Sequence, residues 1–134
     1  MAGFKELEVW QLGREIVRRV YQWTEGFPQE EQFGLKAQIR RAAVSVPANI
    51  SEGYGRKRSP DYIRFLRIAK GSLNELETLA ILAEDVEIAR MPEELESLIA
   101  TTGSKLTNLI EKLRPELVRE AIAAYGSSAE SESE

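Results

Sequence analysis

The feature that most constrains this chain is a repeated spacing of apolar residues by four and then three positions. The longest run comprises Tyr62, Leu66, Ala69, Leu73, Leu76, Ala80 and Ala83. This spacing places all its members on one side of an α-helix, whereas a half-buried strand would need strict alternation of apolar and polar residues. No segment of the sequence shows that alternation. The pattern therefore predicts an all-α fold.

The same kind of spacing recurs along most of the chain. It predicts helices over residues 4–24, 33–52, 60–86 and 92–113. Four amphipathic helices with short connections are typical of an antiparallel up-down-up-down four-helix bundle. We expect one bundle domain over residues 1–125, with a short additional helix after the fourth. The acidic segment 126–134, GSSAESESE, is predicted to be a disordered tail.

Two prolines lie where they should disturb these helices. Pro47 falls inside the second helix, where it removes one hydrogen bond and clashes with the preceding turn. We expect a kink or a break there, with the Ser45 hydroxyl satisfying a freed backbone group. Pro115 is expected to end or kink the fourth helix.

The junction between the second and third helices has its own signals. Gly53 and Gly55 should stop the second helix, one of them in the left-handed conformation of a C-terminal cap. Ser59 is a good N-cap for the third helix, and Pro60 suits its first position. A glycine-rich phosphate loop is a weaker interpretation, because such loops follow a strand.

The third helix has a second apolar register beside the first. It comprises Phe65, Ile68, Ser72, Glu75, Leu79, Leu82 and Val86. A helix with two apolar seams either contacts neighbours on two sides or carries one wide stripe inside a single bundle. Both possibilities remain open at the level of the sequence.

Cysteine and histidine are both absent from the chain. Their absence excludes disulfides, thiolate nucleophiles and cysteine-based zinc sites, and removes the commonest general base. We therefore expect a non-enzymatic protein with no catalytic residues, no cofactor and no metal site. No apolar run approaches the roughly 20 residues that span a bilayer. No secretory signal core is evident, so the expected location is the cytoplasm.

Charge is distributed very unevenly along the chain. Residues 36–70 carry nine Lys or Arg but only two acidic residues, Glu52 and Asp61, a net charge of +7 on a chain whose total is −4. Such a split indicates a polyanionic partner, either nucleic acid or an acidic protein surface.

Six of these cations are predicted to contact nucleic acid. They are Arg56, Lys57, Arg58, Arg64, Arg67 and Lys70. Tyr54 and Tyr62 flank the first three, and aromatic rings beside a basic loop are suited to base stacking. The competing interpretation is an ordinary solvated loop.

The remaining arginines call for a structural interpretation. Arg40 and Arg41 lie next to the apolar stripe of the second helix. A partly buried arginine needs a fixed partner. We expect a structural ion pair between Arg41 and Glu75, either inside the bundle or across a subunit seam.

Two blocks of sequence resemble the signature of the 23S rRNA intervening-sequence protein family. The first comprises Phe27, Pro28, Glu31, Gly34, Leu35, Gln38, Arg40, Arg41, Ala42, Ala43, Ser45, Val46, Pro47, Asn49, Ile50, Glu52, Gly53, Gly55 and Arg56. The second comprises Phe65, Leu66, Ala69, Gly71, Ser72, Leu73, Glu75 and Leu76. Leu7, Val9 and Trp10 in the first helix also fit. The resemblance covers about residues 4–113.

This resemblance implies an up-down-up-down bundle that assembles as a ring-like homopentamer. The family is similar to the accessory variability protein of diversity-generating retroelements, a pentamer with a basic surface that associates with a reverse transcriptase and nucleic acid. The resemblance provides no catalytic residues. We therefore expect a homo-oligomer that binds RNA or DNA. The alternative is an interaction scaffold that docks an acidic partner or a reverse transcriptase.

Overall fold

The computed structural model describes residues 3–56 and 60–133, and within this part the regular secondary structure is helical, joined by short turns and loops. The long helices are α1 (Glu8–Thr24), α2 (Leu35–Tyr54), α3 (Pro60–Asp85) and α4 (Glu93–Ser133). Two single 3₁₀ turns, Phe4–Glu6 and Gln29–Glu31, precede α1 and α2. The predicted all-α class is confirmed.

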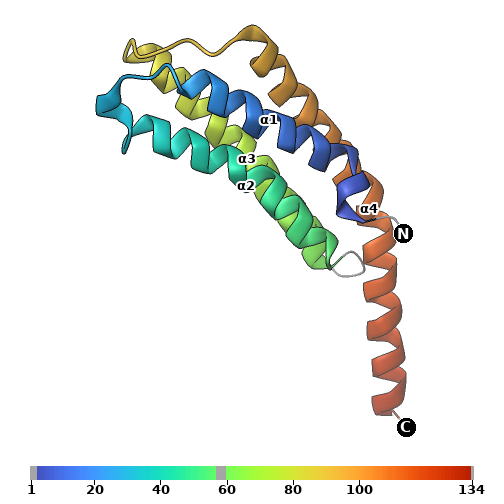
Figure 1. Cartoon of the computed structure of the whole chain (residues 1–134). Helices are drawn as coiled ribbons and strands as arrows, with labels where there is room; N and C mark the ends of the chain where they lie inside the picture. Colours follow the sequence, from blue (N-terminus) through green and yellow to red (C-terminus); the bar gives the residue numbers. More distant parts are fainter. Residues whose placement is uncertain (1–2, 57–59, 134) are drawn as a thin grey trace.

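The four helices form an antiparallel bundle in which each contacts two others. Helix α2 packs against α1 and α3, and α4 packs against α3 and α1. Figure 1 shows that successive helices run in opposite directions. Because these contacts place the helices around the bundle in the order α1, α2, α3, α4, the face between α1 and α4 lies opposite the face between α2 and α3.

Helix α4 is much longer than its apolar spacing predicted. We expected it to end or kink at Pro115, but it continues to Ser133 and includes the segment predicted to be a disordered tail. Figure 1 shows its distal part projecting beyond the other three helices. Pro115 is followed by Glu, Leu, Arg and Ala residues that favour helix, and no further proline interrupts them.

The predicted apolar stripes meet in the centre of the bundle. The largest fully buried apolar side chains are Ile16 and Val20 in α1, Ile39, Val46 and Ile50 in α2, Leu66 and Leu76 in α3, and Leu95 and Leu106 in α4. Thr24, Ser72 and Thr102 are buried among them. Each donates a hydrogen bond to the carbonyl four residues earlier, at 2.8, 3.1 and 2.7 Å respectively, so the core contains these hydroxyls without leaving them unpaired.

The two glycines at the end of α2 differ from their predicted roles, and close contact between helices explains the first of them. Gly53 lies inside α2, and a Cβ there would approach the Phe65 Cβ to 2.7 Å. Gly55 follows α2 with φ of −62°, and none of the described glycines has a positive φ. The predicted left-handed glycine cap is therefore wrong. Gly53 is required by the approach of α3, which the sequence of α2 alone does not reveal.

We expected a kink or a break at Pro47, but α2 is continuous there, so the break does not occur and the kink stays a prediction. The Ser45 hydroxyl also does not take the predicted role. It forms a hydrogen bond with the Ser72 hydroxyl at 2.7 Å and accepts one from the Asn49 amide at 2.9 Å. These bonds join α2 to α3 near the middle of the bundle.

Candidate nucleic-acid interface

Two arginines lie against one aromatic ring where α2 ends and α3 begins. The guanidinium carbon of Arg56 is 4.9 Å from the centre of the Phe65 ring, and that of Arg64 is 4.7 Å away. Sequence reasoning had assigned Phe65 to an apolar seam and overlooked this arrangement. Its nearness to Arg64 in the sequence was the available signal.

The same arginines are held by the two acidic residues of the basic segment. Arg56 pairs with Glu52 at 2.5 Å and reaches Asp61 at 3.9 Å, and Arg64 pairs with Asp61 at 3.3 Å. These ion pairs are exposed and therefore contribute little to stability. Their effect is to orient the guanidinium groups beside Phe65 and to balance the charges of Arg56 and Arg64.

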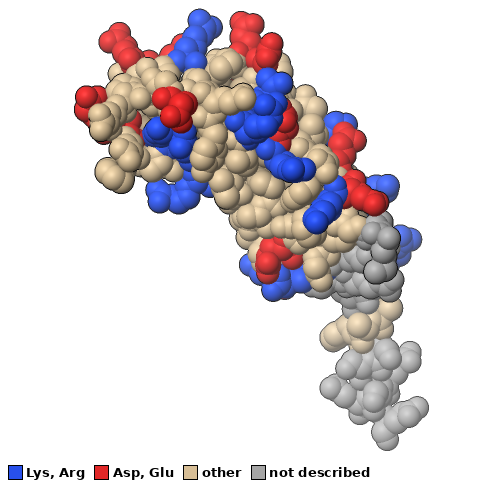
Figure 2. Space-filling model, in the orientation of Figure 1, with Lys and Arg blue, Asp and Glu red and all other residues tan. Residues whose placement is uncertain are grey.

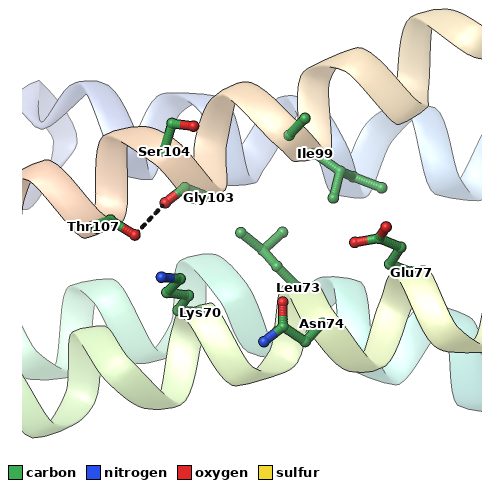
Figure 3. Close-up of a pocket in the computed structure, with 9 residues that line it drawn as sticks. Lys70, Leu73, Asn74, Glu77, Ile99, Gly103, Ser104 and Thr107 are labelled. Carbon is green, nitrogen blue, oxygen red and sulfur yellow. Dashed lines mark hydrogen bonds between the residues drawn. The ribbon is translucent and has the colours of Figure 1, made fainter.

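Two more of the predicted contact residues, Arg67 and Lys70, lie further along α3. Arg67 is exposed, and no ion pair of Arg67 or Lys70 is found in the part of the chain that the structure describes. Lys70 lines a groove of about 260 Å³ between α3 and α4. Figure 3 shows it extending from α3 toward α4, with Asn74 on its own helix and Thr107 on the facing one. Lys57 and Arg58 lie outside the described residues.

The predicted stacking role of Tyr62 is wrong. Its side chain is only 4% exposed, and its ring packs edge-to-face against Tyr54 with centroids 6.1 Å apart. Burial, with a smaller contribution from Tyr54, raises the pKa of the Tyr62 phenol to about 12. Tyr62 is a core residue that supports this corner, and Phe65 is the better candidate for stacking on a base.

The expected ion pair between Arg41 and Glu75 is not formed within the chain. Both residues are exposed, and no ion pair between the two is found among the residues described. A pair between Arg41 of one subunit and Glu75 of another stays a prediction. Within the chain, the neighbouring Arg40 is the arginine with structural partners.

Arg40 joins the start of α2 to the end of α1. Its side chain donates to the Thr24 hydroxyl at 2.8 Å and to the Tyr21 carbonyl at 3.3 Å, and it pairs with Glu25 at 3.1 Å. Its guanidinium also lies 4.1 Å from the centre of the Tyr21 ring. The arginine with fixed partners inside the chain is therefore Arg40, one position before the Arg41 that the sequence analysis selected.

A second basic surface, which sequence reasoning missed, lies between α1 and α2. A depression of about 530 Å³ is lined by Tyr21, Gln32, Phe33, Lys36, Ala37, Arg40, Arg41 and Val44. Phe33 is 89% exposed there, and Tyr21 and Val44 are each 42% exposed. We call this surface the α1–α2 groove. Phe33 lies off the apolar stripe of α2, which was the signal available in the sequence.

Overall charge does not single out either surface. Figure 2 shows Lys and Arg side chains spread along the bundle on the face in view, with acidic side chains among them and uncharged areas between. Across the described ranges we find no group of three or more acidic side chains able to hold a metal ion. None of the helices described combines the length and apolar character needed to cross a bilayer.

Comparison with known proteins identifies the family. The family model of the 23S rRNA-intervening sequence protein matches residues 5–114. The chain belongs to this family. The match includes both basic surfaces and ends one residue before Pro115, so the projecting part of α4 lies outside the 23S rRNA-intervening sequence protein pattern. No curated protein matches the chain.

Proposed function

We propose that this 23S rRNA-intervening sequence protein is a non-enzymatic protein that binds RNA or DNA through one surface at the α2–α3 corner and along α3. The surface comprises Arg56, Arg64, Arg67 and Lys70, with Lys57 and Arg58 in the intervening connection. The observation that supports it is the Phe65 ring with two guanidinium groups 4.9 and 4.7 Å from its centre, near two cations without ion pairs among the described residues.

Each part of this surface suits a different part of a nucleic acid. Unpaired bases stack on aromatic rings and on guanidinium planes, which Phe65, Arg56 and Arg64 provide. Arg67 and Lys70 would neutralise phosphates and release their counterions. Because Glu52 and Asp61 already balance the charges of Arg56 and Arg64, these groups and Phe65 suit bases better than phosphates. Single-stranded segments with accessible bases should therefore bind better than duplex of the same length.

A salt titration with fluorescent single-stranded RNA and DNA tests the proposal. Affinity should fall with salt by a log–log slope of about 0.7 for each neutralised phosphate. Replacing Arg67 and Lys70 by alanine should reduce both affinity and slope. The matched control replaces Arg14 and Lys112, two exposed cations on α1 and α4, and should leave both unchanged. Absence of binding at low salt, or equal losses in the two variants, would contradict the proposal.

Phe65 needs a separate test, because its Cβ also lies close to Gly53. Phe65→Leu keeps an apolar side chain but removes the flat ring. We expect weaker single-strand binding with an almost unchanged salt slope, since no phosphate contact is lost. Unchanged affinity of a folded Phe65→Leu protein would remove base stacking from the proposal.

We also propose that the protein acts as a ring-like homopentamer, the assembly that the family resemblance implied. What supports self-association is the second seam of α3, where Ile68, Leu82 and Val86 remain 40%, 44% and 59% exposed in the single chain. Sedimentation equilibrium would give the mass of the assembly, and Leu82→Glu should reduce it. A monomer at micromolar concentration would contradict this part of the proposal.

The second candidate function is a scaffold whose basic surface docks an acidic partner or a reverse transcriptase. The observation in its favour is that Arg56 and Arg64 already bind carboxylates, those of Glu52 and Asp61, which the carboxylates of a partner protein could replace. Failure of the RNA and DNA titrations, together with an Arg67- and Lys70-dependent protein partner, would favour it.

A further inference from the structure

The distal part of α4 carries an apolar stripe that is largely exposed in the part of the chain that the structure describes. Val118, Ile122 and Tyr125 are 48%, 65% and 78% exposed. Their spacing by four and three residues places them on one side of the helix. We call residues 115–133 the arm. Figure 1 shows it extending away from the other three helices.

The α1–α2 groove offers a surface of matching character. Tyr21, Phe33 and Val44 supply exposed apolar area, and Lys36 and Arg41 lie beside them. In the described part of the chain neither of these two cations has an ion pair. A groove with an apolar floor and a basic rim is suited to a helix with one apolar face and an acidic end.

The arm has that composition. Its sequence contains Glu130 and Glu132 near its end and no basic residue after Arg119, and Glu134 follows it in the chain. Three acidic groups beyond an apolar stripe complement the charge of Lys36 and Arg41. Two arms side by side in parallel would instead bring their acidic ends together, which is unfavourable.

The arm is far from the groove of its own chain. The groove lies at the end of the bundle with the α1–α2 connection, whereas the arm leaves from the opposite end (Figure 1). Helix α2 spans 20 residues between these ends, or about 30 Å at 1.5 Å per residue. A straight helix pointing away cannot return over that distance, so a matching groove must come from another molecule.

We propose that the arm of one subunit docks into the α1–α2 groove of a second copy of the chain, with Val118, Ile122 and Tyr125 against Tyr21, Phe33 and Val44. The contact joins two different surfaces, so it is heterologous and adds subunits head to tail until a ring closes. It requires no nucleic acid and involves none of the residues of the proposed nucleic-acid surface.

Site-directed cross-linking tests this contact in the full chain, which contains no cysteine of its own. An Ile122→Cys protein is mixed with a Val44→Cys protein of different mass and treated with a short bismaleimide, without nucleic acid. We expect the mixed dimer to form several-fold more than in a control mixture. The control pairs Ile122→Cys with Ile81→Cys, an equally exposed position on α3.

The other possible occupants give different products. Efficient cross-linking of Ile122→Cys alone would show arm-to-arm pairing and overturn the proposal. Cross-links from Val44→Cys to Ile81→Cys that exceed those to Ile122→Cys would show that the α3 seam covers the groove, and would also overturn it.

Charge reversal gives an independent readout. Lys36→Glu combined with Arg41→Glu should lower the yield of the Ile122–Val44 cross-link several-fold, and the loss should diminish when Glu130→Lys and Glu132→Lys are introduced in the arm. Arg14→Glu with Lys112→Glu is the matched control and should change nothing. A cross-link yield that stays the same after all four charge-reversing substitutions in the groove and the arm would contradict the proposed docking.

Discussion

The α2–α3 pair and the arm are both long helical segments, but they are held in place in different ways. In the pair, Gly53 allows Phe65 to approach closely, and the Ser45 and Ser72 hydroxyls join the two helices at 2.7 Å. The arm shares no such contact with the bundle and leaves three apolar side chains exposed. The comparison indicates that α2–α3 packing determines the stability of the fold, whereas the arm is free to serve an intermolecular contact.

The sharpest test of this comparison is a pair of glycine substitutions. Gly53→Ala should destabilise the protein by about 1–3 kcal/mol, because the new Cβ would overlap Phe65. Gly71→Ala should stabilise it by about 1 kcal/mol, since nothing lies within 4 Å of a Cβ at that exposed helical site. Denaturant unfolding measures both. Equal effects of the two substitutions would show that α2 and α3 do not approach so closely.

The two adjacent arginines of α2 should also behave differently. Arg40→Ala should cost about 1.5–3 kcal/mol in unfolding free energy, because it removes charged hydrogen bonds to Thr24 and to the Tyr21 carbonyl. Arg41→Ala should change stability by less than about 0.5 kcal/mol, since its side chain is exposed. A thermal melt distinguishes them. If Arg41→Ala lowers stability more than Arg40→Ala, that result would support the expected pair between Arg41 and Glu75 across a subunit seam.

Alkaline pH should weaken the α2–α3 end of the bundle. Unfolded tyrosine loses its proton near pH 10, whereas the pKa of the Tyr62 phenol is raised to about 12 by burial. Between these values the unfolded state binds fewer protons than the folded state, so stability falls as pH rises from about 10 to 12. Tyr62→Phe should flatten this decline in urea titrations at pH 9 to 11. If stability declines with pH equally steeply in the Tyr62→Phe protein, groups other than Tyr62 cause the decline.

The smallest effect is expected in the arm. Ile122→Ala should alter the unfolding free energy of the bundle by less than about 0.5 kcal/mol, because the side chain is 65% exposed. Measurement at low protein concentration separates this value from any contribution of association. A loss comparable to that of Gly53→Ala would mean that the arm packs on its own bundle.

Sequence reasoning located α1, α2 and α3 to within a few residues, because the period of their apolar residues matches the helix itself. It failed at Gly53 and Tyr62, whose roles depend on a neighbouring helix. It chose Arg41 where Arg40 is the structural residue, because adjacent helix positions differ by about 100° in direction and only packing shows which one meets α1. Phe65 was recognised as apolar, but its two guanidinium neighbours required the α2–α3 corner to be assembled.

The end of α4 illustrates a different difficulty. Pro115 and the small polar residues after Tyr125 predicted a helix stop and a disordered segment, yet α4 continues to Ser133. A single proline costs one hydrogen bond and a local clash, which the favourable helix propensity around it offsets.

By itself, the sequence determined the helical class, the four-helix arrangement, the family and the concentration of positive charge in residues 36–70, because periodicity and composition are local properties. Only the tertiary structure decided how that charge is used. Glu52 and Asp61 pair with Arg56 and Arg64, and Glu25 pairs with Arg40. Of the other described cations in this segment, Arg67 and Lys70 lie on α3, whereas Lys36 and Arg41 line the α1–α2 groove. That division depends on distances between residues far apart in the chain, which no local pattern records.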